Sequence, residues 1–389
     1  MDRLYPWLII KRDSINHIKM RIVADTTIPF LKGVVEPSAD VVYLSAKGFT
    51  PEAIKDADAL IVRSIDKCTP QLLRDSKVKL ITTATIGFDH IDTHYCEANG
   101  IAWRNAPGCN APSVAQYVIS SLLVLAQREG NASLKGKSIG IIGVGHVGKQ
   151  VERLATLLGM RVLRNDPPRA EKEGSNGFLP LDDLLGEADI VTLHVPFTRE
   201  GKYPTFHLAD KAFFEKMKPG CWFVNSCRGS VHDTTALLDA CRTGIVKETI
   251  IDCWENEPDI DMDLLQTSSI ASPHIAGFSA DGKSTATRMC LEAIASFFSI
   301  HFEHLSEVVP PSPENPIIDL NDFDHHRIEQ AFLRTFNPEV IDHKLRNEPS
   351  SFEYLRNHYD HPREPKAYQI AHATLEEQET LQKIGFQII

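Results

Sequence analysis

The sequence lacks a segment that could cross a membrane or direct export. None of its apolar runs approaches the roughly 20 residues that span a bilayer. The apolar patch at residues 4–10 is interrupted by Pro6 and followed by charged residues, which makes a poor signal peptide. The first strand pattern begins only near residue 20, so we interpret residues 1–19 as an N-terminal appendage or a misplaced start site. We expect a cytoplasmic protein that has no membrane partner.

The sequence also lacks an excess of positive charge, and it lacks closely spaced cysteine pairs. The chain has 41 Lys and Arg against 52 Asp and Glu, a net charge of −11. This excludes a general nucleic-acid-binding surface, and any anionic substrate must be held by local arginines. The eight cysteines form no C-x-x-C pair, which is typical of reduced thiols. The pairs His301/His304 and His358/His361 have no cysteine or carboxylate cluster beside them, so we predict no metal site.

The pattern along the 389 residues predicts an α/β protein with two or three domains. Residues 21–105 alternate short strand-like runs with helical patterns, and the alternation restarts at Ile139. Apolar helices are predicted near 113–129 and 284–301. A proline-rich linker at 310–316 precedes a small α+β module, in which Ile328, Phe332 and Phe336 lie on one face of a helix.

A glycine-rich turn follows the apolar strand at residues 138–142. Gly143, Gly145 and Gly148 form Gly-x-Gly-x-x-Gly, in which the glycines permit a tight turn, close approach to a pyrophosphate and close helix packing. The next strand ends at Asp166, near the spacing at which an acid binds the adenosine ribose. A helix cap is the alternative role for Asp166. Its charge would repel the extra phosphate of NADP, although Arg164 and Arg169 flank it, and we predict NAD.

Three later strand patterns end in polar groups that we expect to meet at the cofactor crevice. Oxidation of a secondary alcohol needs a base, for which His274 is the candidate, and a carboxylate that orients it. Glu257 is the candidate carboxylate and Glu255 the rival, because spacing alone does not separate them. Arg228 offers a planar set of donors for a substrate carboxylate. Cys227 has no base assigned to activate it, so we expect it to contact the cofactor through its backbone.

These motifs resemble those of the D-2-hydroxyacid dehydrogenase family. The resemblance rests on the glycine loop, Arg228-Gly229, Glu257-Pro258 and Ser-Pro-His-Ile-Ala-Gly at 272–277, and it covers about residues 20–389. More specific are Ala-Pro-Gly-Cys-Asn-Ala at 106–111 and Asn-Asp-Pro-Pro-Arg-Ala at 165–170. The family implies two doubly wound parallel-sheet domains, a flavodoxin-like substrate domain and a Rossmann NAD domain, with a small C-terminal α+β domain for homodimerisation. The expected ranges are 20–112 with 284–309 for the substrate domain, 113–283 for the NAD domain and 310–389 for the dimerisation domain.

The resemblance also implies site residues. Arg228, Glu257 and His274 would be the catalytic trio, with His274 the proton donor in the direction of reduction. Substrate contacts would fall on Ser64, Thr85 and position 278, where Phe278 replaces a usual tyrosine and removes a phenolic hydrogen bond. NAD contacts would fall on Gly143, Gly145, His146, Val147, Gly148, Asp166, Val195, Ser226, Cys227, Arg228, Asp252 near the carboxamide, and Gly277.

The predicted activity is NAD-dependent oxidation of a small phosphorylated 2-hydroxy acid. Two alternatives stay open at this point. One is a related dehydrogenase acting on another acid, such as 3-phosphoglycerate. The other is a non-catalytic protein that senses NAD and transmits redox state to a partner, against which the complete trio of Arg228, Glu257 and His274 argues.

Overall fold

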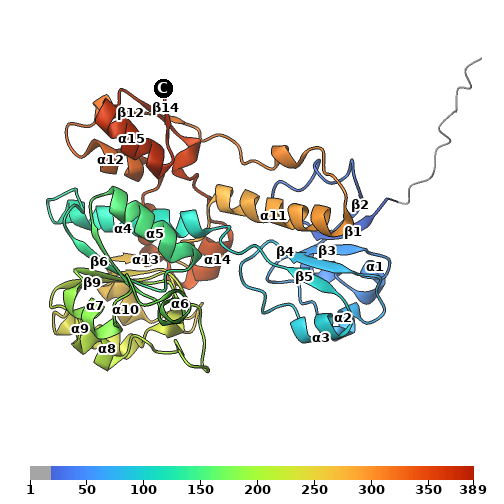
Figure 1. Cartoon of the computed structure of the whole chain (residues 1–389), viewed down its shortest axis with the longest axis horizontal. Helices are drawn as coiled ribbons and strands as arrows, with labels where there is room; N and C mark the ends of the chain where they lie inside the picture. Colours follow the sequence, from blue (N-terminus) through green and yellow to red (C-terminus); the bar gives the residue numbers. More distant parts are fainter. Residues whose placement is uncertain (1–18) are drawn as a thin grey trace, which may run out of the picture. The chain divides into compact units, whose positions relative to one another are not determined.

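The computed structural model describes residues 19–389, and Figure 1 shows its elements. The appendage predicted at residues 1–19 falls, except for Lys19, outside the described residues. The chain divides into two compact units. One runs to Asn105 and resumes over Thr287–Val308, and the other comprises Ala106–Ala286 and Val309–Ile389. Within residues 19–389, no helix combines the length and hydropathy needed to cross a membrane.

The first unit is built on a five-stranded parallel sheet of order β2-β1-β3-β4-β5. Its three central strands, β1, β3 and β4, are buried on both faces, as expected where helices cover a parallel sheet. Thr50 and Thr69 cap α1 and α2, each followed by a proline at the first helical position. The elements are β1 (Arg21–Asp25), β2 (Asp40–Leu44), α1 (Pro51–Ile54), β3 (Ala59–Val62), α2 (Pro70–Leu73), β4 (Leu80–Thr83), α3 (Thr93–Ala98) and β5 (Ala102–Arg104).

The second unit holds a six-stranded parallel sheet of order β11-β10-β9-β8-β6-β7. The strand order reverses beside β6, and ligands of doubly wound sheets bind at the carboxyl ends of strands where this occurs. The predicted α/β fold is therefore confirmed. The elements are α4 (Ala111–Arg128), β6 (Ser138–Ile142), α5 (His146–Leu157), β7 (Arg161–Asn165), α6 (Pro167–Glu173), α7 (Leu181–Glu187), β8 (Ile190–Leu193), α8 (Lys211–Glu215), β9 (Cys221–Asn225), α9 (Thr234–Arg242), β10 (Val246–Ile251), α10 (Met262–Thr267) and β11 (Ile270–Ala271).

The helix predicted at 284–301 is displaced toward the N-terminus. Observed as α11 (Ala280–Phe298), it begins earlier because the Ser279 hydroxyl accepts a hydrogen bond from the Gly282 amide at 2.8 Å and caps its first turn. It ends where Ser299 takes a left-handed conformation with φ 55°. The helix starts in the second compact unit and ends in the first.

The C-terminal part of the second unit contains a three-stranded parallel sheet of order β12-β13-β14. The strand predicted at 366–370 starts later, because Pro365–Ala367 forms a helical turn. Phe332 and Phe336 of the predicted amphipathic face are buried in one apolar cluster with helix α4, so this face packs within the chain. The elements are β12 (Ile317–Asp319), α12 (Arg327–Thr335), α13 (Glu339–Asn347), α14 (Phe352–Asn357), β13 (Gln369–Ala371), α15 (Leu375–Ile384) and β14 (Gln387–Ile388).

A buried ion pair joins this C-terminal part to the start of α11. Asp281 accepts hydrogen bonds from Arg363 Nε at 2.8 Å and Nη2 at 3.1 Å, and from the Glu364 amide at 2.9 Å. Burial opposes the charged form, but the Arg363 bonds outweigh it, and the pKa of Asp281 is lowered. Such a pair contributes stability above the unfolded-state pKa of about 4 and loses it as the pH falls through the folded-state pKa.

We therefore expect Asp281→Asn to lower the free energy of unfolding at pH 7 by about 3 kcal/mol, because it leaves Arg363 without its partner. The difference from the original protein should shrink as the pH falls below about 4, the unfolded-state pKa, and toward the lowered folded-state pKa of Asp281. Urea unfolding at pH 7 and pH 3 measures both values. Asp239→Asn, which removes an exposed pair with Arg242, is the control and should change little. An equal loss at both pH values would contradict the assignment.

Candidate active site

The glycine loop has the geometry that its sequence predicts. Gly143 has φ +87°, and a Cβ there would lie 2.6 Å from the His194 carbonyl oxygen. A Cβ on Gly148 would clash with the Gly143 carbonyl oxygen. Gly145 caps α5 with φ −78°, and a Cβ there would meet no protein atom within 4 Å. Two glycines are thus required by packing, whereas the third keeps open space at a helix N-terminus, where a pyrophosphate binds.

This difference yields a prediction for Gly145→Ala. The new methyl would project into the space that the cofactor needs, so we expect the Kd for NAD to rise at least about tenfold. The free energy of unfolding without cofactor should hardly change, because the methyl meets nothing and φ is unstrained. Calorimetric titration and urea unfolding measure the two quantities. Gly186→Ala, also in open space, is the control, and unchanged NAD affinity in Gly145→Ala would contradict the role.

Asp166 connects the glycine loop to α6. Its carboxylate accepts hydrogen bonds from the Arg169 amide at 3.1 Å, as the helix cap, and from the Val144 amide at 2.8 Å. The two arginines beside it already have partners. Arg169 pairs with Glu173, and Arg164 pairs with another carboxylate and a carbonyl. Neither guanidinium is free for a second phosphate, which favours NAD over NADP.

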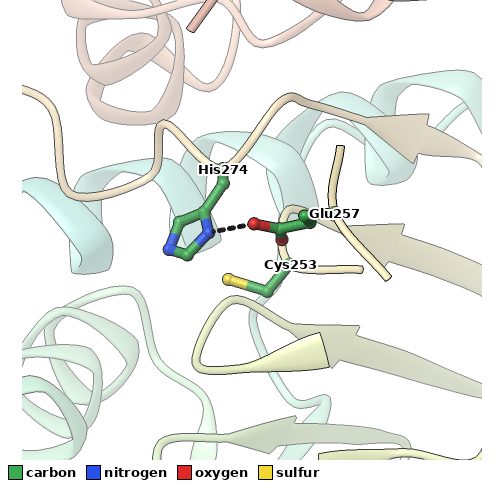
Figure 2. Close-up of side chains that lie close together, drawn as sticks. All are labelled: Cys253, Glu257 and His274. Atoms are coloured by element: carbon green, nitrogen blue, oxygen red, sulfur yellow. Dashed lines mark hydrogen bonds and ion pairs between the residues drawn. The ribbon is translucent and has the colours of Figure 1, made fainter. Parts of the chain in front are cut away.

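His274 and Glu257 form a hydrogen-bonded pair, shown in Figure 2. Nδ1 of His274 lies 2.8 Å from Oε2 of Glu257, whose other oxygen accepts from the Trp254 amide at 2.8 Å. Burial alone would raise the pKa of Glu257, but the hydrogen bond and charge of His274 outweigh it, and the pKa is lowered. Glu257 is therefore ionised at neutral pH. Because His274 uses Nδ1 for this bond, Nε2 is the nitrogen left to exchange a proton with a substrate.

The rival carboxylate is turned elsewhere. Glu255 accepts a hydrogen bond from Nε2 of His207 at 2.7 Å and one from the Thr234 amide at 3.1 Å. The two glutamates follow the same strand, β10, and the structure pairs Glu257 with His274. The spacing of residues in the sequence did not show which of the two glutamates contacts His274.

Asp252 anchors the loop that carries His274. It is only 1% exposed, and one carboxylate oxygen accepts from the Ser272 hydroxyl at 2.6 Å and the Ile275 amide at 2.7 Å. The other oxygen accepts from the Ala276 amide at 3.1 Å. Ser272 also shares a hydrogen bond of 2.7 Å with the Tyr117 hydroxyl. Sequence reasoning expected Asp252 at the cofactor carboxamide and missed this anchor, for which no sequence signal existed.

Arg228 lies in the loop after β9 and is exposed, with Nη1 donating to the Cys227 carbonyl at 2.7 Å. A Cβ on Gly229 would clash with the Trp254 carbonyl oxygen, so the Arg-Gly loop packs closely against the loop that carries Glu257. Ser226 is 9% exposed, and no residue of 19–389 bonds its buried hydroxyl. A buried hydroxyl without a partner at the carboxyl end of β9 fits a bound ligand.

The thiols beside this loop are neutral. Burial raises the pKa of Cys227 to about 11 and that of Cys253 well above its usual value, so neither is poised as a nucleophile. Cys253 lies beside the His274 and Glu257 pair (Figure 2), with ligand atoms of all three within 4.8 Å of one another. The absence of a metal stays a prediction.

The segment 106–111 touches both functional loops. A Cβ on Gly108, which has φ +76°, would lie 2.8 Å from Nδ1 of His146 at the start of α5. A Cβ on Gly277 would clash with Nδ2 of the Asn110 side chain. The Gly-Cys-Asn motif therefore packs between the glycine loop and the His274 loop, a contact that was not predicted from the sequence.

The remaining predicted residues are positioned as follows. Val147 lies in the first turn of α5, and Val195 follows β8 and is half-buried. Ser64 and Thr85 belong to the other compact unit, after the neighbouring strands β3 and β4. The Thr85 hydroxyl donates to the Gly87 carbonyl at 2.8 Å, whereas Ser64 is exposed. Their contact with a substrate stays a prediction.

The chain is similar to known dehydrogenases in both sequence and structure. Residues 120–276 match the model of the D-isomer specific 2-hydroxyacid dehydrogenase NAD binding domain. The chain is 52% identical to erythronate-4-phosphate dehydrogenase of Porphyromonas gingivalis over 370 residues, which cover 94% of this chain and 100% of the relative. The chain belongs to the erythronate-4-phosphate dehydrogenase family. The Klebsiella pneumoniae enzyme of the same name is 35% identical over 95% of this chain and 99% of its own length.

Solved structures support the same fold and the cofactor of this family member. NAD-bound 3-phosphoglycerate dehydrogenase of Entamoeba histolytica matches with 28% identity and a TM-score of 0.59, covering 72% of this chain and 96% of its own. D-lactate dehydrogenase of Aquifex aeolicus, complexed with NAD and lactic acid, matches with 26% identity and a TM-score of 0.55, covering 75% of this chain and 100% of its own. NAD is thus the cofactor of this dehydrogenase, in agreement with the open space at Gly145.

Proposed function

We propose that this chain oxidises 4-phospho-D-erythronate to (R)-3-hydroxy-2-oxo-4-phosphobutanoate with NAD. The observation that carries the proposal is the His274 and Glu257 pair at 2.8 Å, in a chain 52% identical to an erythronate-4-phosphate dehydrogenase. The reaction is a step toward pyridoxal 5′-phosphate, which places the protein in pyridoxine biosynthesis.

Arg228, Glu257 and His274 have different roles in the proposed reaction. Nε2 of neutral His274 accepts the proton of the C2 hydroxyl, and Glu257 stabilises the imidazolium that forms. Arg228 binds the substrate carboxylate and polarises the carbonyl as it forms. NAD, when bound, supplies the acceptor for the hydride that leaves C2. In the reverse direction His274 donates the same proton.

The cofactor would be held by the glycine loop and by polar groups around the crevice. Gly143, Gly145 and Gly148 leave the backbone and the N-terminus of α5 open to the pyrophosphate. Asp166 would accept from the ribose hydroxyls. The other contacts proposed are His146, Val147, Val195, Ser226, Cys227, Arg228, Asp252 and Gly277.

We also propose the cytoplasm as the location, and a homodimer formed through residues 310–389. The proposed division keeps the substrate domain at 20–112 and 284–309, with the NAD domain at 113–283. Because Phe332 and Phe336 pack within their own unit, the dimer contact would use other faces of the C-terminal part.

The experiment measures NADH absorbance with purified protein, NAD and one of three acids, which are 4-phospho-D-erythronate, 3-phosphoglycerate and D-lactate. Each assay is run with and without 2-oxoglutarate as an acceptor, so that tightly held cofactor does not hide turnover. Preference for 4-phospho-D-erythronate is the expected result. Turnover with another acid would replace the substrate and keep the mechanism, and silence with all three would favour the NAD-sensing alternative.

A further inference from the structure

Two cationic side chains and an imidazole lie around Phe278, which follows the His274 loop directly. The Lys283 ammonium lies 5.1 Å from the centroid of the Phe278 ring, and the Arg356 guanidinium carbon lies 5.9 Å from it. The His361 imidazole stacks on the same ring at 5.9 Å. The Phe278 amide donates to the Ile275 carbonyl at 2.7 Å, so the backbone of the His274 loop holds the ring in place. Lys283 comes from α11, and the other two groups come from the C-terminal part of the unit.

The segment that carries His361 is firmly attached to the start of α11 and to α4. The Ala280 amide donates to the Pro362 carbonyl at 3.0 Å, and the Ser279 hydroxyl donates to Glu364 at 2.8 Å. From α4, the Gln116 amide nitrogen donates to the Arg363 carbonyl at 3.1 Å. Together with the Asp281 pair, these bonds hold residues 362–364 against the start of α11. Lys283 on α11 and His361 beside Pro362 are therefore held near Phe278 by anchored backbone, whereas Arg356 reaches the ring from α14.

Arg356 differs from its neighbouring arginines in having no carboxylate bonded to it. Arg346 pairs with Asp342, and Arg363 pairs with Asp281. Within residues 19–389, Arg356 forms no such ion pair, and its close contact is the face of the Phe278 ring. It is half-buried and close enough to Glu257 to lower the pKa of that carboxyl. A partly desolvated guanidinium with open donors, next to the proton-transfer pair, is suited to bind an anion.

We propose that Arg356, assisted by Lys283, forms the subsite for the phosphate group of the substrate. The proposal rests on the proposed function, which gives the substrate a phosphate two carbons from the oxidised carbon. The net charge of −11 means that such a dianion needs local cations. The Phe278 side chain has no hydrogen-bond donor, so the groups flanking its ring supply the donors. The C-terminal part thereby completes the active site of its own chain, besides any part it plays in assembly.

The test compares Arg356→Met with Arg334→Met, which removes an exposed cation from α12 in the same part of the chain. For Arg356→Met, the KM for 4-phospho-D-erythronate should rise by about 10- to 100-fold, the loss expected for a charged bidentate contact. The KM for D-erythronate, which has no phosphate, and the Kd for NAD should stay within about twofold. Arg356→Lys, which keeps the charge and loses the planar fork, should give an intermediate rise. Arg334→Met should match the original protein throughout.

A second measurement is independent of the substrate. Inorganic phosphate is titrated calorimetrically into the NAD complex, and its Kd should rise for Arg356→Met by a factor similar to that of the KM. If the original protein oxidises 4-phospho-D-erythronate and Arg356→Met has an unchanged KM, the subsite is refuted and the proposed function stands. If the original protein does not oxidise that acid, the proposed function fails, and the phosphate titration then decides the subsite alone. Equal phosphate affinity of the two proteins, or no binding by the original, would overturn it.

Discussion

Replacing His274 with asparagine should lower kcat about 10²- to 10⁴-fold while leaving the Kd for NAD nearly unchanged. The imidazole is the group positioned to take the hydroxyl proton, and general base catalysis contributes about this factor. None of the proposed cofactor contacts involves the His274 side chain, so NAD binding should survive. Steady-state kinetics and titration of NAD measure the two effects. An enzyme that keeps its kcat would exclude His274 as the base, and a protein with no turnover before the change would favour the sensing alternative.

The two glutamates of the same loop provide a matched comparison. Glu257→Gln removes the charge that stabilises the imidazolium of His274, so kcat should fall by about 10²-fold or more. Glu255→Gln changes a residue bonded to His207 and the Thr234 amide, and kcat should stay within a few-fold. If the two substitutions had equal effects, the pairing of Glu257 with His274 would have no catalytic importance.

Removal of the Asp252 carboxylate should damage both stability and catalysis. Asp252→Ala leaves the Ser272 hydroxyl and the Ile275 and Ala276 amides without their acceptor in a site that is 1% exposed. Each buried group left unpaired costs about 1–3 kcal/mol, so the free energy of unfolding should fall by about 3 kcal/mol or more. The loop that aims His274 loses its anchor, and kcat should fall with it. Urea unfolding and steady-state kinetics measure these losses.

Tyr117→Phe is a milder change in the same hydrogen-bond network. It removes only the hydroxyl that shares a 2.7 Å hydrogen bond with Ser272, and about 1 kcal/mol of stability should be lost. Asp252→Ala with unchanged stability and weakened NAD binding would contradict the anchoring role, and would return Asp252 to the carboxamide contact predicted from the sequence.

Much of the framework could be predicted from the sequence because its determinants are local. A strand, a Gly-x-Gly-x-x-Gly turn and a helix are neighbours in the chain, and the steric demand on Gly148 comes from Gly143 of the same turn, although Gly143 itself packs against His194 of a later strand end. Alternation of apolar runs with helical patterns likewise predicted parallel sheets in both units. The ends of elements were predicted less accurately. Helix α11, for example, begins before its predicted start because Ser279 caps its first turn.

The sequence by itself determined the α/β class, the dinucleotide site and the chemistry available at the strand ends, because periodicity and turn residues express short-range preferences. Only the tertiary structure decided which of Glu255 and Glu257 meets His274, since residues two apart on a loop can face different neighbours. It also decided that Asp252 is an anchor and that Arg356 reaches Phe278. Those assignments depend on which loops and helices meet in the folded chain, and sequence spacing does not record that.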